Sequence, residues 1–152
     1  MAELSGYTTS RLARATGGLY LLLLPVPVVC FLAAVATDIS YARTAFLMWL
    51  HFSEWAIAAG LAFGALAALV LLVEFGANRR VRTRAGWTHL VLFYASLLVA
   101  LANSFVHTID GWTAVVWTGM SLSVIGAALA LAAALALFGV PMPSLARREA
   151  RP

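Results

Sequence analysis

Four long apolar stretches dominate the sequence, and no other feature constrains the fold as strongly. They cover about residues 15–36, 50–75, 87–106 and 112–140. Each is near or above the ~20 residues that a helix needs to cross the hydrocarbon core of a bilayer. Backbone polar groups must find partners within the segment in lipid, so these stretches predict helices. The sequence therefore predicts an all-α integral membrane protein, a single four-span transmembrane helical bundle over residues 1–152 with up-down topology.

Composition and charge support the membrane interpretation. With 63% hydrophobic and 11% charged residues, the chain lies far from soluble or disordered proteins, which carry about a quarter charged residues. Nine of its ten arginines precede the first stretch, follow the fourth or lie between the second and third, and only Arg43 lies on the other side. This bias predicts that both termini face the cytoplasm of a bacterial inner membrane. Arginines do not alternate with aromatic residues, so the sequence does not predict binding of nucleic acid.

Polar residues follow one stripe along the third stretch. His89, Ser96, Ala100, Asn103 and His107 are separated by steps of three, four and seven residues, which lie on one face of a helix. We expect this stripe to face the bundle interior and to form hydrogen bonds between helices. Two local features accompany it: Pro25 and Pro27 predict a kink in the first span, and Asp110 is placed to cap the fourth helix.

Histidines and carboxylates form a predicted cluster on the outer side. His51 and Glu54 begin the second span, and His107 and Asp110 end the third, with one helical turn within each pair. Two histidines and two carboxylates suit zinc or non-haem iron, so the sequence predicts a divalent-metal site if the pairs converge. Asp38 and Asn103 would then supply contacts to the metal ligands. The alternative is that these groups are solvated or hydrogen-bonded and that Asp110 only caps a helix.

A second group lies on the inner side, where Glu74 ends the second span and His89 opens the third. Ionisable residues within a span are costly and suggest function. One hypothesis is a structural ion pair of Glu74 with Arg79 or Arg80, and the other is a proton or cofactor site formed by Glu74 and His89.

Several short segments together resemble the DUF2231 family of bacterial membrane proteins. They are LPVPVVCF at residues 24–31, TD at 37–38, FSEW at 52–55, NRR at 78–80, WTH at 87–89 and NSFVHTIDGWT at 103–113. The resemblance extends over residues 17–139. It implies a four-span bundle of undefined activity that occurs with redox modules such as Rieske and cytochrome domains, and hence a link to haem or electron transfer.

The resemblance also implies a cofactor hypothesis. The family often carries His-Pro just before its Pro-x-Pro, where this chain has Tyr20. A haem b held between the first and third spans would here meet Tyr20 and His89, with Glu74 nearby. Tyrosine ligates haem iron in some proteins, but histidine is the usual ligand in electron-transfer sites.

The sequence is compatible with three functions. The first is a non-enzymatic inner-membrane module associated with redox or haem proteins. The second is a protein that binds or passes a metal or small solute through the outer His and carboxylate cluster. The third is a structural assembly subunit. The expected partners are the lipid bilayer and either a membrane redox protein or further copies of the chain.

Overall fold

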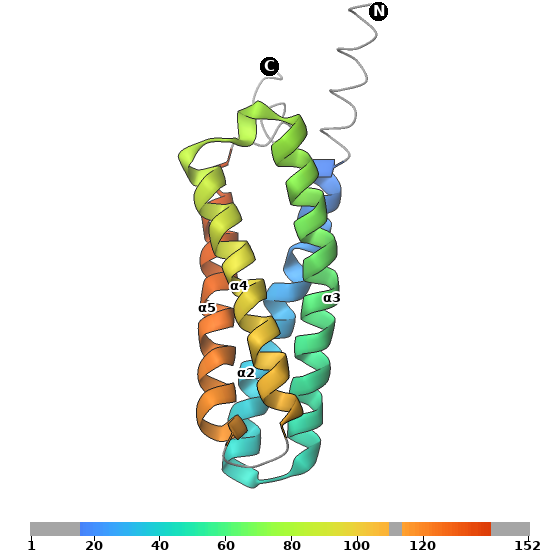
Figure 1. The fold of residues 1–152 in the computed structure, drawn as a ribbon, viewed down its shortest axis with the longest axis vertical. Helices are drawn as coiled ribbons and strands as arrows, with labels where there is room; N and C mark the ends of the chain where they lie inside the picture. The colour runs from blue at the N-terminus through green and yellow to red at the C-terminus, as the bar shows by residue number, and fades with distance from the viewer. Residues whose placement is uncertain (1–15, 110–113, 141–152) are drawn as a thin grey trace, which may run out of the picture.

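The structure is a computed structural model that describes residues 16–109 and 114–140. Four helices run side by side and alternate in direction (Figure 1). The first spans Thr16–Thr44 and contains α2, Pro25–Thr44. The others are α3 (Leu47–Ala77), α4 (Arg84–Thr108) and α5 (Met120–Leu137), with a short 3-10 helix η1 (Arg79–Val81) and a π-helical segment η2 (Ala114–Gly119) leading into α5. No strand occurs in the described ranges, which confirms the all-α bundle.

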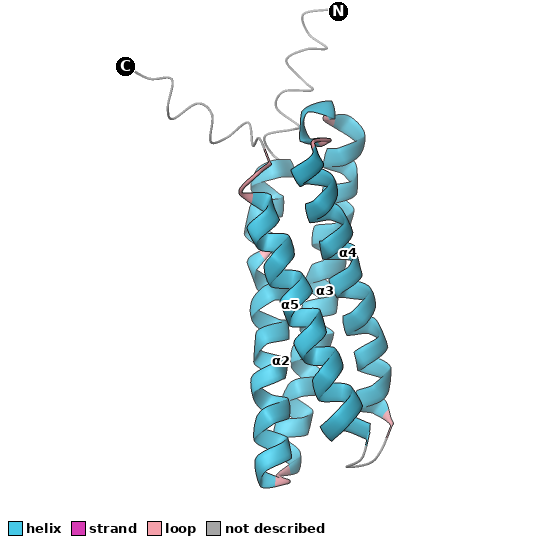
Figure 2. Cartoon of the chain, turned by 90° about the vertical axis from the view of Figure 1, so that its left-hand side faces the viewer, coloured by secondary structure: helices cyan, strands magenta, loops and turns pink. Residues whose placement is uncertain are grey.

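The helical bundle has a proximal and a distal end. The proximal end holds Thr16, η1 and Val140, and the distal end holds the α2–α3 turn together with the end of α4 and the start of η2 (Figures 1 and 2). At the distal end Ala45 adopts the left-handed conformation with φ 54° and donates its N–H to the Tyr41 carbonyl at 2.8 Å. This conformation ends α2 at Thr44, and the chain reverses direction so that α3 begins at Leu47.

The outer surface of the bundle is apolar on every side. All four helices are long and apolar enough to span a membrane, and large side chains point away from the core, among them Trp55, Leu98, Phe105, Trp117 and Phe138. A helix that is hydrophobic all round must be surrounded by apolar material, which here is lipid. The predicted integral membrane class is therefore confirmed.

The first span is longer than the sequence predicted. The polar residues after residue 36 suggested its end, but the helix continues to Thr44. The hydroxyls of Thr37, Ser40 and Thr44 each donate to the carbonyl four residues earlier, at 2.9, 2.8 and 2.7 Å. These bonds satisfy the hydroxyls within the helix, so the helix continues past the end of the apolar stretch.

The first helix has a local irregularity immediately before Pro25. A turn at Leu24 separates helical residues 16–23 from α2, in which Pro25 occupies the first position. Leu24 still donates its N–H to the Tyr20 carbonyl at 2.9 Å. Proline lacks an N–H and fits the first position of a helix, so the break costs little hydrogen bonding.

Packing is closest where small residues face large ones. α2 lies between α3 and α5, and α4 lies between α5 and α3. A Cβ added at Gly60 would lie 2.5 Å from the Phe31 ring and 3.1 Å from Cys30 Cβ. Gly60 therefore lets α2 and α3 approach each other closely.

We expect Gly60→Ala to lower the free energy of unfolding by about 1–3 kcal/mol, because the buried Phe31 ring must move. Gly76→Ala is the matched control in the same helix, since nothing lies within 4 Å of its added Cβ. Reversible unfolding in mixed detergent micelles measures both, and equal stability of the two variants would contradict this packing.

Candidate functional site: a buried polar network at the distal end

All four helices contribute polar side chains to one buried network near the distal end, the distal network. Its members are Asp38 from α2, Ser53 from α3, Asn103 and His107 from α4, and Ser123 from α5. None is more than 5% exposed. Buried polar groups need hydrogen-bond partners. Because the partners of these side chains lie on other helices, the distal network constrains how the four helices are positioned against one another.

Asp38 lies at the centre of the distal network. Its Oδ1 accepts from Ser53 Oγ at 2.5 Å and lies 3.0 Å from His107 Nε2. Its Oδ2 accepts from Ser123 Oγ at 2.6 Å. One carboxylate thus contacts each of the other three helices, and both of its oxygens are satisfied.

His107 faces an oxygen acceptor from each ring nitrogen. Nδ1 lies 3.0 Å from the Asn103 carbonyl, and Nε2 lies 3.0 Å from Asp38 Oδ1. A backbone carbonyl only accepts, so Nδ1 must carry hydrogen. The contact between Nε2 and the carboxyl oxygen then also requires a proton, on the nitrogen or on the oxygen. The Asp38–His107 pair therefore holds one shared proton and is neutral as a unit.

Serine, histidine and aspartate meet here, but they do not form a catalytic triad. Ser53 Oγ lies 3.2 Å from His107 Nε2, and the same nitrogen contacts Asp38. A triad places the serine and the carboxylate on opposite ring nitrogens. The hydroxyl of Ser53, which is fully buried, donates to Asp38 instead of to the imidazole.

Asn103 extends the distal network towards the middle of the bundle. Its Nδ2 donates to Ser123 Oγ at 2.7 Å. Its Oδ1 has no hydrogen-bond partner among the described residues and is buried. A cavity of about 10 Å³ adjoins Asn103 and Ser123, which is close to the room that one water molecule needs.

The four predicted metal ligands do not all meet. His51 Nδ1 and Glu54 Oε2 lie 3.2 Å apart, with side chains that are 59% and 35% exposed. His107 points inward to Asp38 instead, and in residues 16–109 and 114–140 no three His, Cys, Asp or Glu side chains gather to hold a metal ion. Asp110 lies outside the described residues. Asp38 and Asn103, expected as supporting residues, belong to the distal network.

The proximal end contains a second buried histidine with a different arrangement. Tyr20 Oη lies 2.6 Å from His89 Nε2, and His89 Nδ1 lies 2.7 Å from the Ala133 carbonyl. The carbonyl fixes a hydrogen on Nδ1, and in the neutral imidazole Nε2 then accepts from the tyrosine hydroxyl. Tyr20, His89 and Phe93 pack through their rings, with His89 and Phe93 stacked at 6.1 Å.

These residues do not fit a haem. Iron would need the lone pair of His89 Nε2, which the Tyr20 hydroxyl already engages. The cavity beside them, which Glu74 also lines, measures about 10 Å³, room for about one water molecule. Tyr20 and His89 are thus brought together as the resemblance implied, but as partners of each other.

The predicted ion pair of Glu74 is wrong. Glu74 is buried, and its carboxylate accepts from the Thr16 hydroxyl and, at 2.9 Å, from Asn78 Nδ2. Neither Arg79 nor Arg80 forms a salt bridge with it in the described parts of the chain. Both arginines lie in η1 and are exposed, because the turn after α3 directs them outward.

Sequence reasoning missed Ser53 and Ser123. Serine is common in membrane helices and gives no distinct signal by itself. The available signal was the position of each serine. Ser53 lies three residues after residue 50, where the second span was predicted to begin, and Ser123 is followed by the small residues Gly126 and Ala130 at steps of three and four.

Fold and site together define a multi-pass helical membrane protein with a polar core. The sequence model of one family, described as "Predicted membrane protein (DUF2231)", matches residues 20–140. The chain therefore belongs to the DUF2231 family, as its motifs indicated. No curated protein and no solved structure matches it.

The two distal histidines should differ sharply on substitution. We expect His107→Ala to lower the free energy of unfolding by about 3 kcal/mol or more, because Asp38 would remain buried without its proton-sharing partner. His51→Ala should change it by no more than about 0.5 kcal/mol, since an exposed ion pair contributes little. Reversible unfolding in mixed micelles measures the free energy of unfolding of both variants. Equal losses of this free energy would contradict the expectation that the buried histidine matters more than the exposed one.

Proposed function

We propose that this chain is a non-enzymatic membrane module that stores one proton in the Asp38–His107 pair. The observation that carries the proposal is that His107 faces an oxygen acceptor from both ring nitrogens inside a membrane span. Such a pair can release its shared proton, with the electron pair of the N–H or O–H bond staying on nitrogen or oxygen, and can bind a proton there again. Ionisable residues at membrane depth are found in proton relays, which supports this assignment.

The surroundings of the pair favour storage of a single proton. Ser53 and Ser123 hold both oxygens of Asp38 through hydroxyl donors. From α3 the Glu54 carboxylate adds a negative field at His107, whereas α5 contributes the uncharged Ser123. Loss of the proton would leave a net negative charge among these groups, and its return would restore a neutral unit.

The partner class comes from the family resemblance. The resemblance implies that members of the family occur with redox modules, and many redox reactions take up or release protons. We propose that this module works beside a membrane redox protein and supplies or accepts a proton there, while the haem belongs to that partner. Both ring nitrogens of His89 already have hydrogen-bond partners, which supports placing the haem in the partner and not in this chain.

A proton-release titration tests proton storage directly. We expect the purified protein in lipid nanodiscs to release one proton on alkaline titration while its helical circular dichroism remains intact. Asp38→Asn should lose this release. Ser123→Ala is the matched control, because it removes a hydrogen bond to Asp38 but no titratable group.

Two outcomes would overturn the storage proposal. One is a release that occurs only when the helices unfold, which is the behaviour of a pair that merely ties helices together. The other is an Asp38→Asn variant that titrates as the unmodified protein does.

We also propose an orientation. All described arginines except Arg43 lie at the proximal end, at residues 79, 80, 82 and 84. Basic residues concentrate on the cytoplasmic side of bacterial inner membranes. The proximal end and both termini would then face the cytoplasm, and the distal network would lie towards the outer leaflet.

Reporter fusions test this orientation. A phosphatase fused after Arg84 should be inactive, since it would remain in the cytoplasm, and one inserted after Ala45 should be active. The reverse pattern would contradict the orientation without affecting proton storage.

A further inference from the structure

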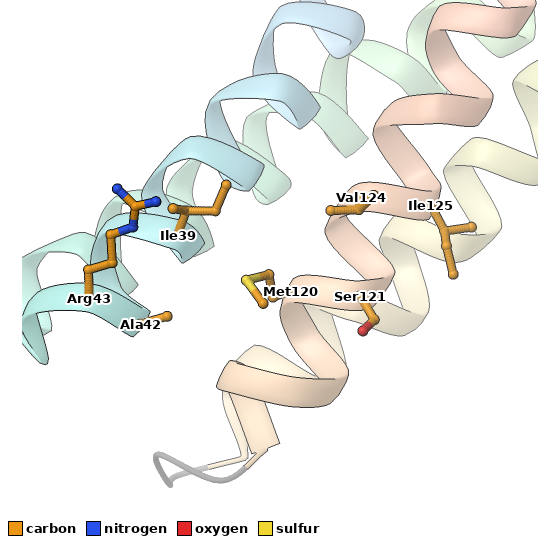
Figure 3. Close-up of a pocket in the computed structure, with 7 residues that line it drawn as sticks. All are labelled: Ile39, Ala42, Arg43, Met120, Ser121, Val124 and Ile125. Carbon is orange, nitrogen blue, oxygen red and sulfur yellow. The ribbon is translucent and has the colours of Figure 1, made fainter.

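An apolar groove lies between the distal parts of α2 and α5 (Figure 3). Its volume is about 650 Å³, far above the two small cavities of the interior. Ile39, Ala42 and Arg43 of α2 form one wall, and Met120, Val124 and Ile125 of α5 form the other. The groove opens sideways from the bundle, where the spanning helices meet lipid.

The exposed apolar side chains that line the groove favour contact with hydrocarbon. Ile39, Val124 and Ile125 are 38%, 48% and 49% exposed, so other parts of the described chain do not cover them. In a bilayer such side chains contact acyl chains. The unbranched Met120 side chain adapts readily to the shape of a neighbouring group.

Arg43 gives the groove a cationic end. It occupies the last turn of α2, is exposed, and extends beside Ile39 (Figure 3). It forms no hydrogen bond or ion pair with any described residue. It is also the one arginine at the distal end within the described ranges, since the others lie in or next to η1. A guanidinium at the end of a spanning helix matches the depth of lipid phosphates.

A second groove provides an internal comparison. It lies between α3 and α4, has a volume of about 300 Å³, and is lined by Leu61, Ala65, Tyr94, Leu97, Leu98 and Leu101. No charged side chain borders it. It can therefore seat an acyl chain but offers nothing that distinguishes one headgroup from another.

We propose that the α2–α5 groove binds one phospholipid with an anionic headgroup, its acyl chain along Met120 and Val124 and its phosphate on Arg43. Guanidinium binds phosphate through paired hydrogen bonds, and a net negative headgroup avoids the competing ammonium of a zwitterionic lipid. This assignment is independent of proton storage, because it uses none of the residues of the distal network.

Native mass spectrometry of the detergent-solubilised protein tests the proposal. Phosphatidylglycerol and phosphatidylcholine with identical acyl chains serve as probes, and glycerol 3-phosphate serves as a probe without a chain. The protein should retain phosphatidylglycerol in preference to phosphatidylcholine. Arg43→Gln should weaken binding of phosphatidylglycerol by roughly tenfold, the effect of losing a charged hydrogen bond. Arg80→Gln, the matched exposed arginine at the proximal end, should leave it unchanged.

A second variant tests the acyl seat. Val124→Trp fills the groove from an exposed position and should weaken both lipids while leaving the helical circular dichroism intact. Equal retention of the two lipids by the unmodified protein would overturn the proposal. So would an unchanged preference in Arg43→Gln, or glycerol 3-phosphate competing as well as the intact lipid, since the groove would then contribute nothing.

Discussion

A carboxyl group inside a membrane bundle must find partners, and Asp38 finds them on all three other helices. Its contacts with Ser53, His107 and Ser123 join α2 to α3, α4 and α5 at one level. Rotation of any helix about its axis would leave a buried polar group without a partner, at a cost of several kcal/mol in hydrocarbon. This requirement fixes the register of the distal half more strongly than the surrounding apolar contacts can, because lipid is as apolar as the helix surfaces.

The two buried histidines show how neighbouring groups determine chemistry. Each donates Nδ1–H to a backbone carbonyl, of Ala133 for His89 and of Asn103 for His107. The difference lies at Nε2. For His89 the partner is a tyrosine hydroxyl, which can donate, so a neutral imidazole has a hydrogen-bond partner at each nitrogen. For His107 the partner is a carboxyl oxygen, so one proton is shared. This contrast is the reason that we propose proton storage at the distal end and not at the proximal end.

Hydropathy and periodicity predicted the four helices and the polar stripe of α4, because lipid imposes both length and inward polarity. The first helix continues past the apolar stretch to Thr44, because hydroxyl-to-carbonyl bonds within α2 satisfy its polar side chains. Side-chain partners were harder to predict. Sequence does not determine helix rotation, so His107 was paired with His51, whereas the bundle turns it towards Asp38. Glu74 met neutral donors instead of arginine, because the chain turns at Asn78 and η1 directs the arginines outward.

The interior and the surface of the bundle differ in the space that they leave open. The interior is closed, with cavities of about 10 Å³, whereas the groove beside Arg43 opens to lipid. Solid-state NMR of protein labelled with ¹⁵N in histidine and ¹³C in aspartate, in lipid bilayers, locates the proton shared by Asp38 and His107. We expect one proton within this pair, on Nε2 or on the carboxyl group, and a hydrogen-bonded correlation between the two, while His89 is protonated at Nδ1 alone. An ionised Asp38 beside an unprotonated His107 Nε2 would contradict it.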